Sequence, residues 1–126
     1  MRFAEDMVQF IGDGLYKKAF DALLKNDSEE AAICRYFMVK YVICSYLSAI
    51  DVSNGVSDAD VAMSYGFNWA PPSAICSLLG GRNGIEKMIE TDERIKIFLY
   101  GIDLSILDEQ VYHAEIDYRR YFKAAL

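Results

Sequence analysis

The sequence is poor in histidine, cysteine and proline. It holds one histidine, three cysteines and two prolines in 126 residues, so a catalytic or metal site would have few histidine or cysteine side chains to use. A histidine base or a histidine zinc site would therefore have to use His113 alone. His113 stands two positions before Glu115 in an expected helix, where such a pair does not face each other. Adjacent carboxylates occur at expected helix starts, where capping explains them. We predict no catalytic residue and no metal ligand in this chain.

The cysteines do not form a recognisable framework. Cys34, Cys44 and Cys76 are odd in number and have no C-x-x-C spacing, which argues against a disulfide scaffold or a zinc site. We expect all three to be buried, reduced side chains in a cytoplasmic protein. The first residues lack the basic stretch and apolar run of a signal peptide.

The chain also has no excess of basic residues. Thirteen Lys and Arg stand against nineteen Asp and Glu, for a net charge of −6, which disfavours a nucleic acid or an anionic membrane as partner. The most apolar stretch, residues 31–50, contains Arg35 and Lys40. Each charge would cost about 2.5–3.5 kcal/mol near a bilayer centre, so a buried helix of a soluble domain is the better interpretation.

Strand-like alternation of apolar and polar residues is missing too, whereas helical periodicity is frequent. We expect helices at 4–24, 29–50, 58–65, 74–79, 83–90, 92–100 and 108–125, with a buried strand as the alternative for 92–100. Residues 29–50 are apolar almost all the way round, which is typical of a helix packed on several sides. The length and composition fit one domain, residues 1–126. The predicted fold class is all-α, a compact bundle of about six or seven helices around a long central hydrophobic helix.

Local signals define the expected helix ends. The pair Gly12 and Gly14 can break the first helix, whose expected core face is Val8, Ile11, Leu15, Ala19 and Leu23. Asp27 or Ser28 can cap the second helix. Further signals are an N-cap at Ser57 with Asp60 in a capping box, a left-handed C-cap at Gly66, an N-cap at Ser73, and a stop at Gly80 and Gly81.

Neither glycine-rich segment suits a nucleotide. Gly12-Asp13-Gly14 has Lys17 where a dinucleotide fingerprint needs its third glycine, and no strand precedes it. Residues 80–84 lack the Lys-Ser/Thr ending of a phosphate loop, so we interpret them as a helix–helix turn. We predict no cofactor site in this chain.

Residues 57–72 carry the most informative pattern. The run from Ser57 to Trp69 resembles the D-I-D-x-A-M-x-x-G-F-x-W/Y pattern in the C-terminal domain of NAD-dependent 3-hydroxyacyl-CoA dehydrogenases. A long helix before it and a proline-led helix ending at glycine after it complete the resemblance, over about residues 30–90. The residues that carry it are Asp58, Asp60, Met63, Gly66, Phe67, Asn68, Trp69 and Pro72. Physically, Ala62 and Met63 should pack the inner face of the short helix.

The resemblance implies a helical domain like the C-terminal domain of 6-phosphogluconate dehydrogenase. Such a domain lines the acyl-CoA cleft and forms a homodimer in fatty-acid β-oxidation enzymes. The NAD site and the catalytic histidine and glutamate would lie in a separate N-terminal domain, so the isolated chain should be inactive. The motif residues would be mainly structural, with acyl-CoA cleft lining as their other role.

Three positions depart from the family pattern. Cys34 precedes Arg35 where the family has the asparagine that contacts substrate, the M-G-P turn is Ala70-Pro71-Pro72, and an expected aspartate is Ser77. Arg82, Lys87, Arg94 and Lys96 either meet CoA phosphates or are solvated surface charges. The alternative function is a self-contained helical protein-interaction module. A small enzyme using His113 or acidic residues is a third reading.

Overall fold

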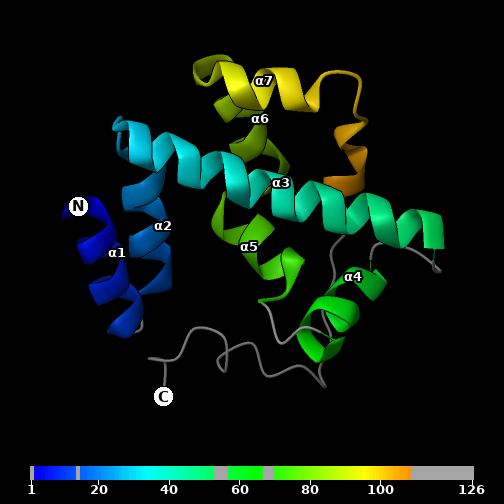
Figure 1. Ribbon diagram of the computed structural model, residues 1–126, viewed down its shortest axis with the longest axis horizontal. Coiled ribbons are helices and arrows are strands. Elements are labelled where there is room, and N and C mark those ends of the chain that lie inside the picture. Colours follow the sequence, from blue (N-terminus) through cyan, green and yellow to red (C-terminus); the bar gives the residue numbers. More distant parts are fainter. Residues whose placement is uncertain (1, 14, 53–56, 67–69, 109–126) are drawn as a thin grey trace.

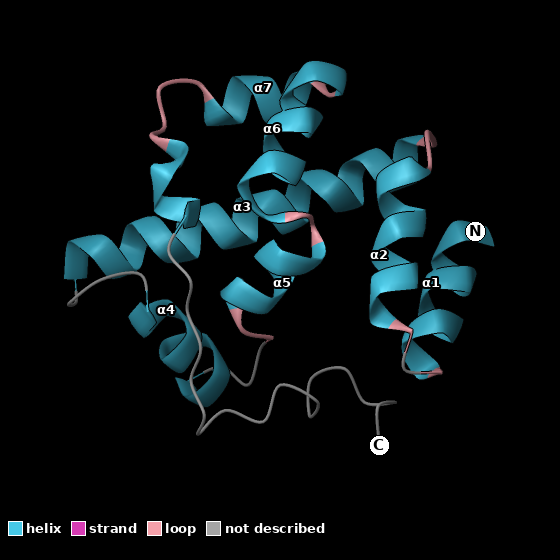
Figure 2. Cartoon of the chain, turned by 180° about the vertical axis from the view of Figure 1, so that it is seen from behind, coloured by secondary structure: helices cyan, strands magenta, loops and turns pink. Residues whose placement is uncertain are grey.

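The computed structural model describes residues 2–13, 15–52, 57–66 and 70–108, and every regular element among them is a helix (Figures 1 and 2). The α-helices are α1 (Arg2–Gly12), α2 (Tyr16–Lys25), α3 (Glu29–Val52), α4 (Ser57–Val61), α5 (Pro72–Leu78), α6 (Gly81–Thr91) and α7 (Glu93–Leu99). A π-helix, η1 (Ala62–Gly66), and a 3₁₀-helix, η2 (Leu104–Asp108), complete the set. The all-α prediction is confirmed. The expected helix 108–125, which includes His113, lies outside the described residues.

The expected first helix is two helices. α1 ends at Gly12 and α2 begins at Tyr16, so the predicted break near Gly12 and Gly14 is confirmed. The expected core face is partly wrong, because Val8 is 71% exposed and Leu15 is 45% exposed. The break changes the phase of the apolar repeat. The buried side chains of this pair are instead Met7, Ala19, Phe20 and Leu23.

Ser28 caps the start of α3, and Arg35 of α3 joins this helix to the end of α2. The Ser28 hydroxyl accepts a hydrogen bond from the Ala31 amide at 3.2 Å, so Ser28 is the predicted cap of α3. The Arg35 guanidinium donates to the carbonyls of Leu23 and Asn26 at 2.7 and 2.6 Å. Carbonyls at a helix C-terminus have no partner within their own helix, and Arg35 satisfies those of α2.

The central helix α3 crosses the whole molecule and packs against α2, α4, α5 and α7 (Figure 1). Its inner face buries Val39, Val42, Ile43 and Tyr46. The helix α3 therefore packs on several sides, as predicted, while its outer face is open, with Phe37 62% exposed. Residues Glu29–Asp51 are long and apolar enough to cross a membrane by composition, a test that core helices of soluble proteins also pass.

Glycines make the turn from α5 into α6. Gly80 and Gly81 have φ values of 96° and 66°, in the left-handed region that glycine adopts without strain. A Cβ on Gly84 would lie 2.1 Å from the Leu79 carbonyl oxygen, so only glycine lets α6 pass this close to the end of α5. The predicted turn between two helices is confirmed, but it lies at Leu79 and Gly80, and residues 81–84 are the first turn of α6.

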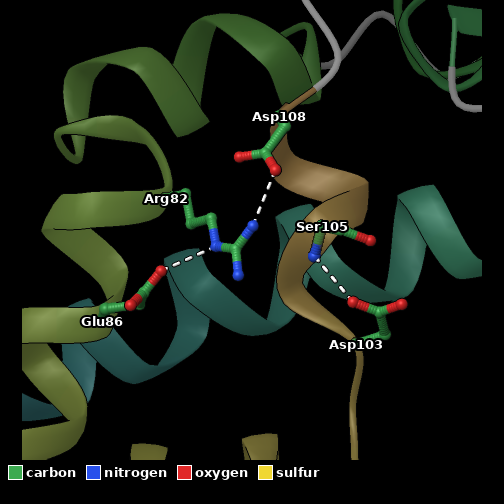
Figure 3. A network of polar contacts seen from close by, with 5 residues as sticks. All are labelled: Arg82, Glu86, Asp103, Ser105 and Asp108. Atoms are coloured by element: carbon green, nitrogen blue, oxygen red, sulfur yellow. Dashed lines mark hydrogen bonds and ion pairs between the residues drawn. The ribbon is translucent and has the colours of Figure 1, made fainter.

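The last described elements fold back onto α6. Residues 93–99 are helical rather than a strand, and the Asp92 carboxylate caps α7 by accepting from the amides of Arg94 and Ile95. Arg82 on α6 pairs with Glu86 at 2.7 Å and with Asp108 of η2 at 2.6 Å (Figure 3). Asp103 accepts from the Ser105 amide at the start of η2, and this bond lowers the pKa of Asp103. These contacts fix η2 against α6.

Candidate functional site

Asp60 joins α4 to α5, at the segment whose sequence resembles the dehydrogenase pattern. It is fully buried on α4, and its carboxylate accepts from the Ser73 amide at 2.9 Å and from the Ser73 hydroxyl. The helix α5 starts at Pro72, with Pro71 as its N-cap and no cap from its own side chains. Asp60 therefore supplies the missing acceptor from another helix, where its charge also favours the positive end of α5. The prediction that Ser73 is the N-cap is wrong.

A second contact holds the same joint to the central helix. The Tyr41 hydroxyl on α3 donates to the carbonyl of Ala70, just before the buried Pro71 and Pro72. Proline fixes the backbone, so this bond and Asp60 set the angle at which α5 leaves the joint. Asp58 is half-buried on α4.

The middle of the segment differs from expectation. Residues 62–66 form the π-helix η1, which holds one more residue per turn than an α-helix and so shifts the buried face. Ala59 and Ser64 are buried, Met63 is half-buried and Ala62 is exposed, so the expected Ala62 and Met63 face is wrong. Gly66 ends η1 without a positive φ, so it is not a left-handed cap. Phe67, Asn68 and Trp69 lie outside the described residues.

The cysteines differ from one another in exposure. Cys76 on α5 is buried, Cys34 is half-buried and Cys44 is exposed, so the expectation that all three are buried is wrong. Burial, followed by the charge of Asp60, raises the pKa of the Cys76 thiol to about 11. A thiol with so high a pKa is protonated near neutral pH, which makes Cys76 a packing residue.

A polar groove of about 800 Å³ lies between the α2–α3 turn and α6–α7. Four cationic and four acidic residues line it, together with Gly80, Asn83 and Gly84 at the start of α6. The cationic residues are Lys25, Arg35, Lys87 and Arg94, and the acidic ones are Asp27, Glu29, Asp92 and Glu93. The volume falls within the roughly 300–1,000 Å³ typical of small-molecule sites.

The cations of the groove divide into engaged and free groups. Arg35 is bonded to the carbonyls of α2, and Arg94 pairs with Glu29 across α7 and α3. Lys25 and Lys87 have no acidic partner within 4 Å among the described residues. One Asp92 oxygen caps α7, and the other is buried and accepts no hydrogen bond from the described part of the chain. Among the described residues, the groove therefore holds two unpaired ammonium groups, those of Lys25 and Lys87, two unpaired carboxylates, those of Asp27 and Glu93, and one unused acceptor on Asp92.

Two of the cationic residues that line this groove, Lys87 and Arg94, could be predicted from the sequence, and Lys25 could not. Of the four candidate cations from the sequence, Lys87 and Arg94 line the groove, Arg82 is bound to Glu86 and Asp108, and Lys96 lies outside it. Lys25 was missed because it is sixty-two positions from Lys87, and no local spacing connects them. Cys34, at the position of the substrate-contacting asparagine, does not line the groove.

Across the described residues, no group of three or more His, Cys, Asp or Glu side chains could hold a metal ion. Comparisons with family models, with curated proteins and with solved structures found no match. The features of this chain that bear on function are the Asp60–Ser73 joint, the groove and the exposed surface.

Proposed function

We propose that this chain is a non-catalytic helical domain of the 3-hydroxyacyl-CoA dehydrogenase type, on the substrate side of the enzyme. One observation carries the proposal: the long helix α3, the short acidic helix α4 and the proline-led α5 follow one another, and the Asp60–Ser73 contact joins α4 to α5. The family pattern has the same elements in the same order. Its aspartate thus has a physical role here, which is to fix the start of the next helix.

The partners follow from this proposal. A nucleotide-binding domain would supply NAD and the catalytic groups, a second copy would form a homodimer, and the chain alone would be inactive. Acyl-CoA would be the ligand, with its phosphates at Lys25 and Lys87 in the polar groove. A cytoplasmic location stays a prediction of the sequence.

Calorimetric titration tests the ligand assignment. We expect CoA to bind the chain weakly, with a Kd between about 10 µM and 1 mM, because two exposed ammonium groups provide most of the attraction. The double variant Lys25→Glu, Lys87→Glu should lose this binding, whereas Lys17→Glu, Lys96→Glu makes the same charge change outside the groove and should retain it. Tight NAD binding, no CoA binding, or CoA binding that ignores Lys25 and Lys87 would each contradict the proposal.

The second candidate function is a helical interaction module without enzymatic parentage. The open outer face of α3, with Phe37 62% and Leu47 38% exposed, favours it. Such a module would bind a protein through α3 and would have no affinity for CoA. The titration therefore separates the two functions.

A further inference from the structure

The outer face of α3 carries a regular row of exposed residues, which we call the α3 seam. Its first half is Glu30, Ile33, Phe37 and Lys40, and Cys44, Leu47 and Asp51 continue it. All seven are exposed, and they follow one another at alternating steps of three and four. This is the spacing with which one helix contacts another along a coiled-coil seam.

The seam is exposed along its length, although the Lys40 ammonium lies over the rings of Tyr36 on α3 and Phe98 on α7, 5.5 and 6.0 Å from their centroids. The described packing is on the opposite face of α3, where Val39, Val42, Ile43 and Tyr46 are buried. The helix α6 passes behind α3 in Figure 1 and in front of it in Figure 2. Phe37 is 62% exposed, a large apolar surface for a residue in the middle of a 24-residue helix. An apolar row of this kind on a straight helix indicates a contact with another helix.

The order of charges along the first half of the seam indicates which helix could pack against it. Read from the N-terminus, the order is acidic Glu30, apolar Ile33, apolar Phe37 and basic Lys40. Read backwards, the same row is basic, apolar, apolar and acidic, so the segment is complementary to an antiparallel copy of itself. A parallel copy would instead place Lys40 against Lys40 and Glu30 against Glu30.

We propose that α3 docks antiparallel onto α3 of a second copy of this chain through Glu30, Ile33, Phe37 and Lys40. The two-fold axis passes between Ile33 and Phe37, so that Ile33 packs on Phe37 of the partner subunit and Lys40 meets Glu30 of the partner subunit. A two-fold contact uses the same patch on both subunits, as this one does. A charged residue at a seam position can set the register of two packed helices, and the pairing of Lys40 with Glu30 does so here.

This inference deepens the second-copy contact in the proposed function, and it can fail independently of the ligand assignment. CoA titration reports on the groove between α2, α3, α6 and α7, while self-association reports on the outer face of α3. A chain that binds CoA as a monomer would refute only the dimer.

Sedimentation velocity over a range of concentrations tests the dimer. We expect a reversible dimer that Lys40→Glu weakens about tenfold, because two attractions become two repulsions. Phe37→Ser should weaken it more than tenfold, since both copies lose an anchor. The matched controls Lys96→Glu and Ile97→Ser make the same changes on exposed positions of α7, where Ile97 is 67% exposed, and should leave the dimer unchanged.

Charge exchange tests the register. The double variant Glu30→Lys, Lys40→Glu restores both pairs in the antiparallel arrangement and should recover the wild-type dissociation constant within about threefold. Recovery by Asp51→Lys, Lys40→Glu instead would overturn the proposed half of the seam. A monomer at every concentration, or monomers that pellet with phosphatidylcholine vesicles through Phe37, would overturn the proposal itself.

Discussion

The buried carboxylate of Asp60 is the residue on which the joint between α4 and α5 depends. It satisfies two donors of Ser73, thirteen positions away in the chain, in a place that excludes solvent. Losing the partner of a buried polar group costs the full desolvation of that group, which is more than the net value of the bond.

We expect Asp60→Ala to lower the free energy of unfolding by about 2–4 kcal/mol, since it leaves the Ser73 amide and hydroxyl without their acceptor. Asp60→Asn keeps one acceptor oxygen and should cost less. Denaturant unfolding followed by circular dichroism measures both. Glu90→Gln, the loss of an exposed carboxylate, serves as control, and equal effects of Asp60→Ala and Glu90→Gln would contradict the role of Asp60.

The cysteines should react in the order of their exposure. With its pKa raised from 9.0 to about 11, Cys76 has about 100-fold less thiolate near neutral pH than an unperturbed thiol. Maleimide labelling followed by mass spectrometry should modify Cys44 first and Cys76 only after unfolding. Prompt labelling of Cys76 in the native protein would show that α5 is not packed as described.

The same shift predicts how stability depends on alkaline pH. Because the pKa is raised in the folded state, the contribution of the neutral Cys76 thiol is fully present below pH 9 and is lost as the pH rises towards about 11. Unfolding free energies of wild type and Cys76→Ala should therefore converge through this range. A constant difference between them would contradict the shift.

At the scale of elements, close approach between α5 and α6 depends on one glycine. We expect Gly84→Ala to cost about 2–3 kcal/mol in spite of its better helix propensity, because the new Cβ would overlap the Leu79 carbonyl. The neighbouring Asn83→Ala adds no such overlap on an exposed position and should be nearly neutral or slightly stabilising. Thermal unfolding measures the pair, and a stabilised Gly84→Ala would contradict the packing.

Helix positions could be predicted from the sequence because their signals are local. Periodicity, the break near Gly12, the cap at Ser28 and the turn at Gly80 each act within a few residues. The π-helix at residues 62–66 could not be predicted, since it arises when tertiary packing overrides an α-helical pattern. Gly66 was expected to be a left-handed cap because the sequence predicts an α-helix before it, whereas it ends a π-helix and has no positive φ.

The functional surfaces were less predictable because they are assembled from distant residues. Asp60 was expected to cap its own helix, and its bond to Ser73 depends on how α5 folds back. Lys25 and Lys87 meet at one groove only because Arg35 holds α2 to α3. The open face of α3 could not be located from the sequence either, because a helix that is apolar almost all the way round gives no sign of which face stays uncovered.

For the whole molecule, the residues that hold the helices together differ from those that form surfaces open to other molecules. The Asp60 joint and the Arg82 cluster fix the elements, while the groove and the α3 seam remain open to other molecules. This division is what we expect of a domain that works by binding rather than by its own chemistry.

Amide chemical-shift mapping with CoA tests the central claim most directly. Adding CoA to the ¹⁵N-labelled chain should shift the amides around Lys25, Gly80, Lys87 and Arg94, while NAD at the same concentration should shift none of them. The variant Lys25→Glu, Lys87→Glu should remove the response. Shifts that CoA produces only outside the groove, or a groove response to NAD that exceeds the response to CoA, would contradict a substrate-side role for this domain.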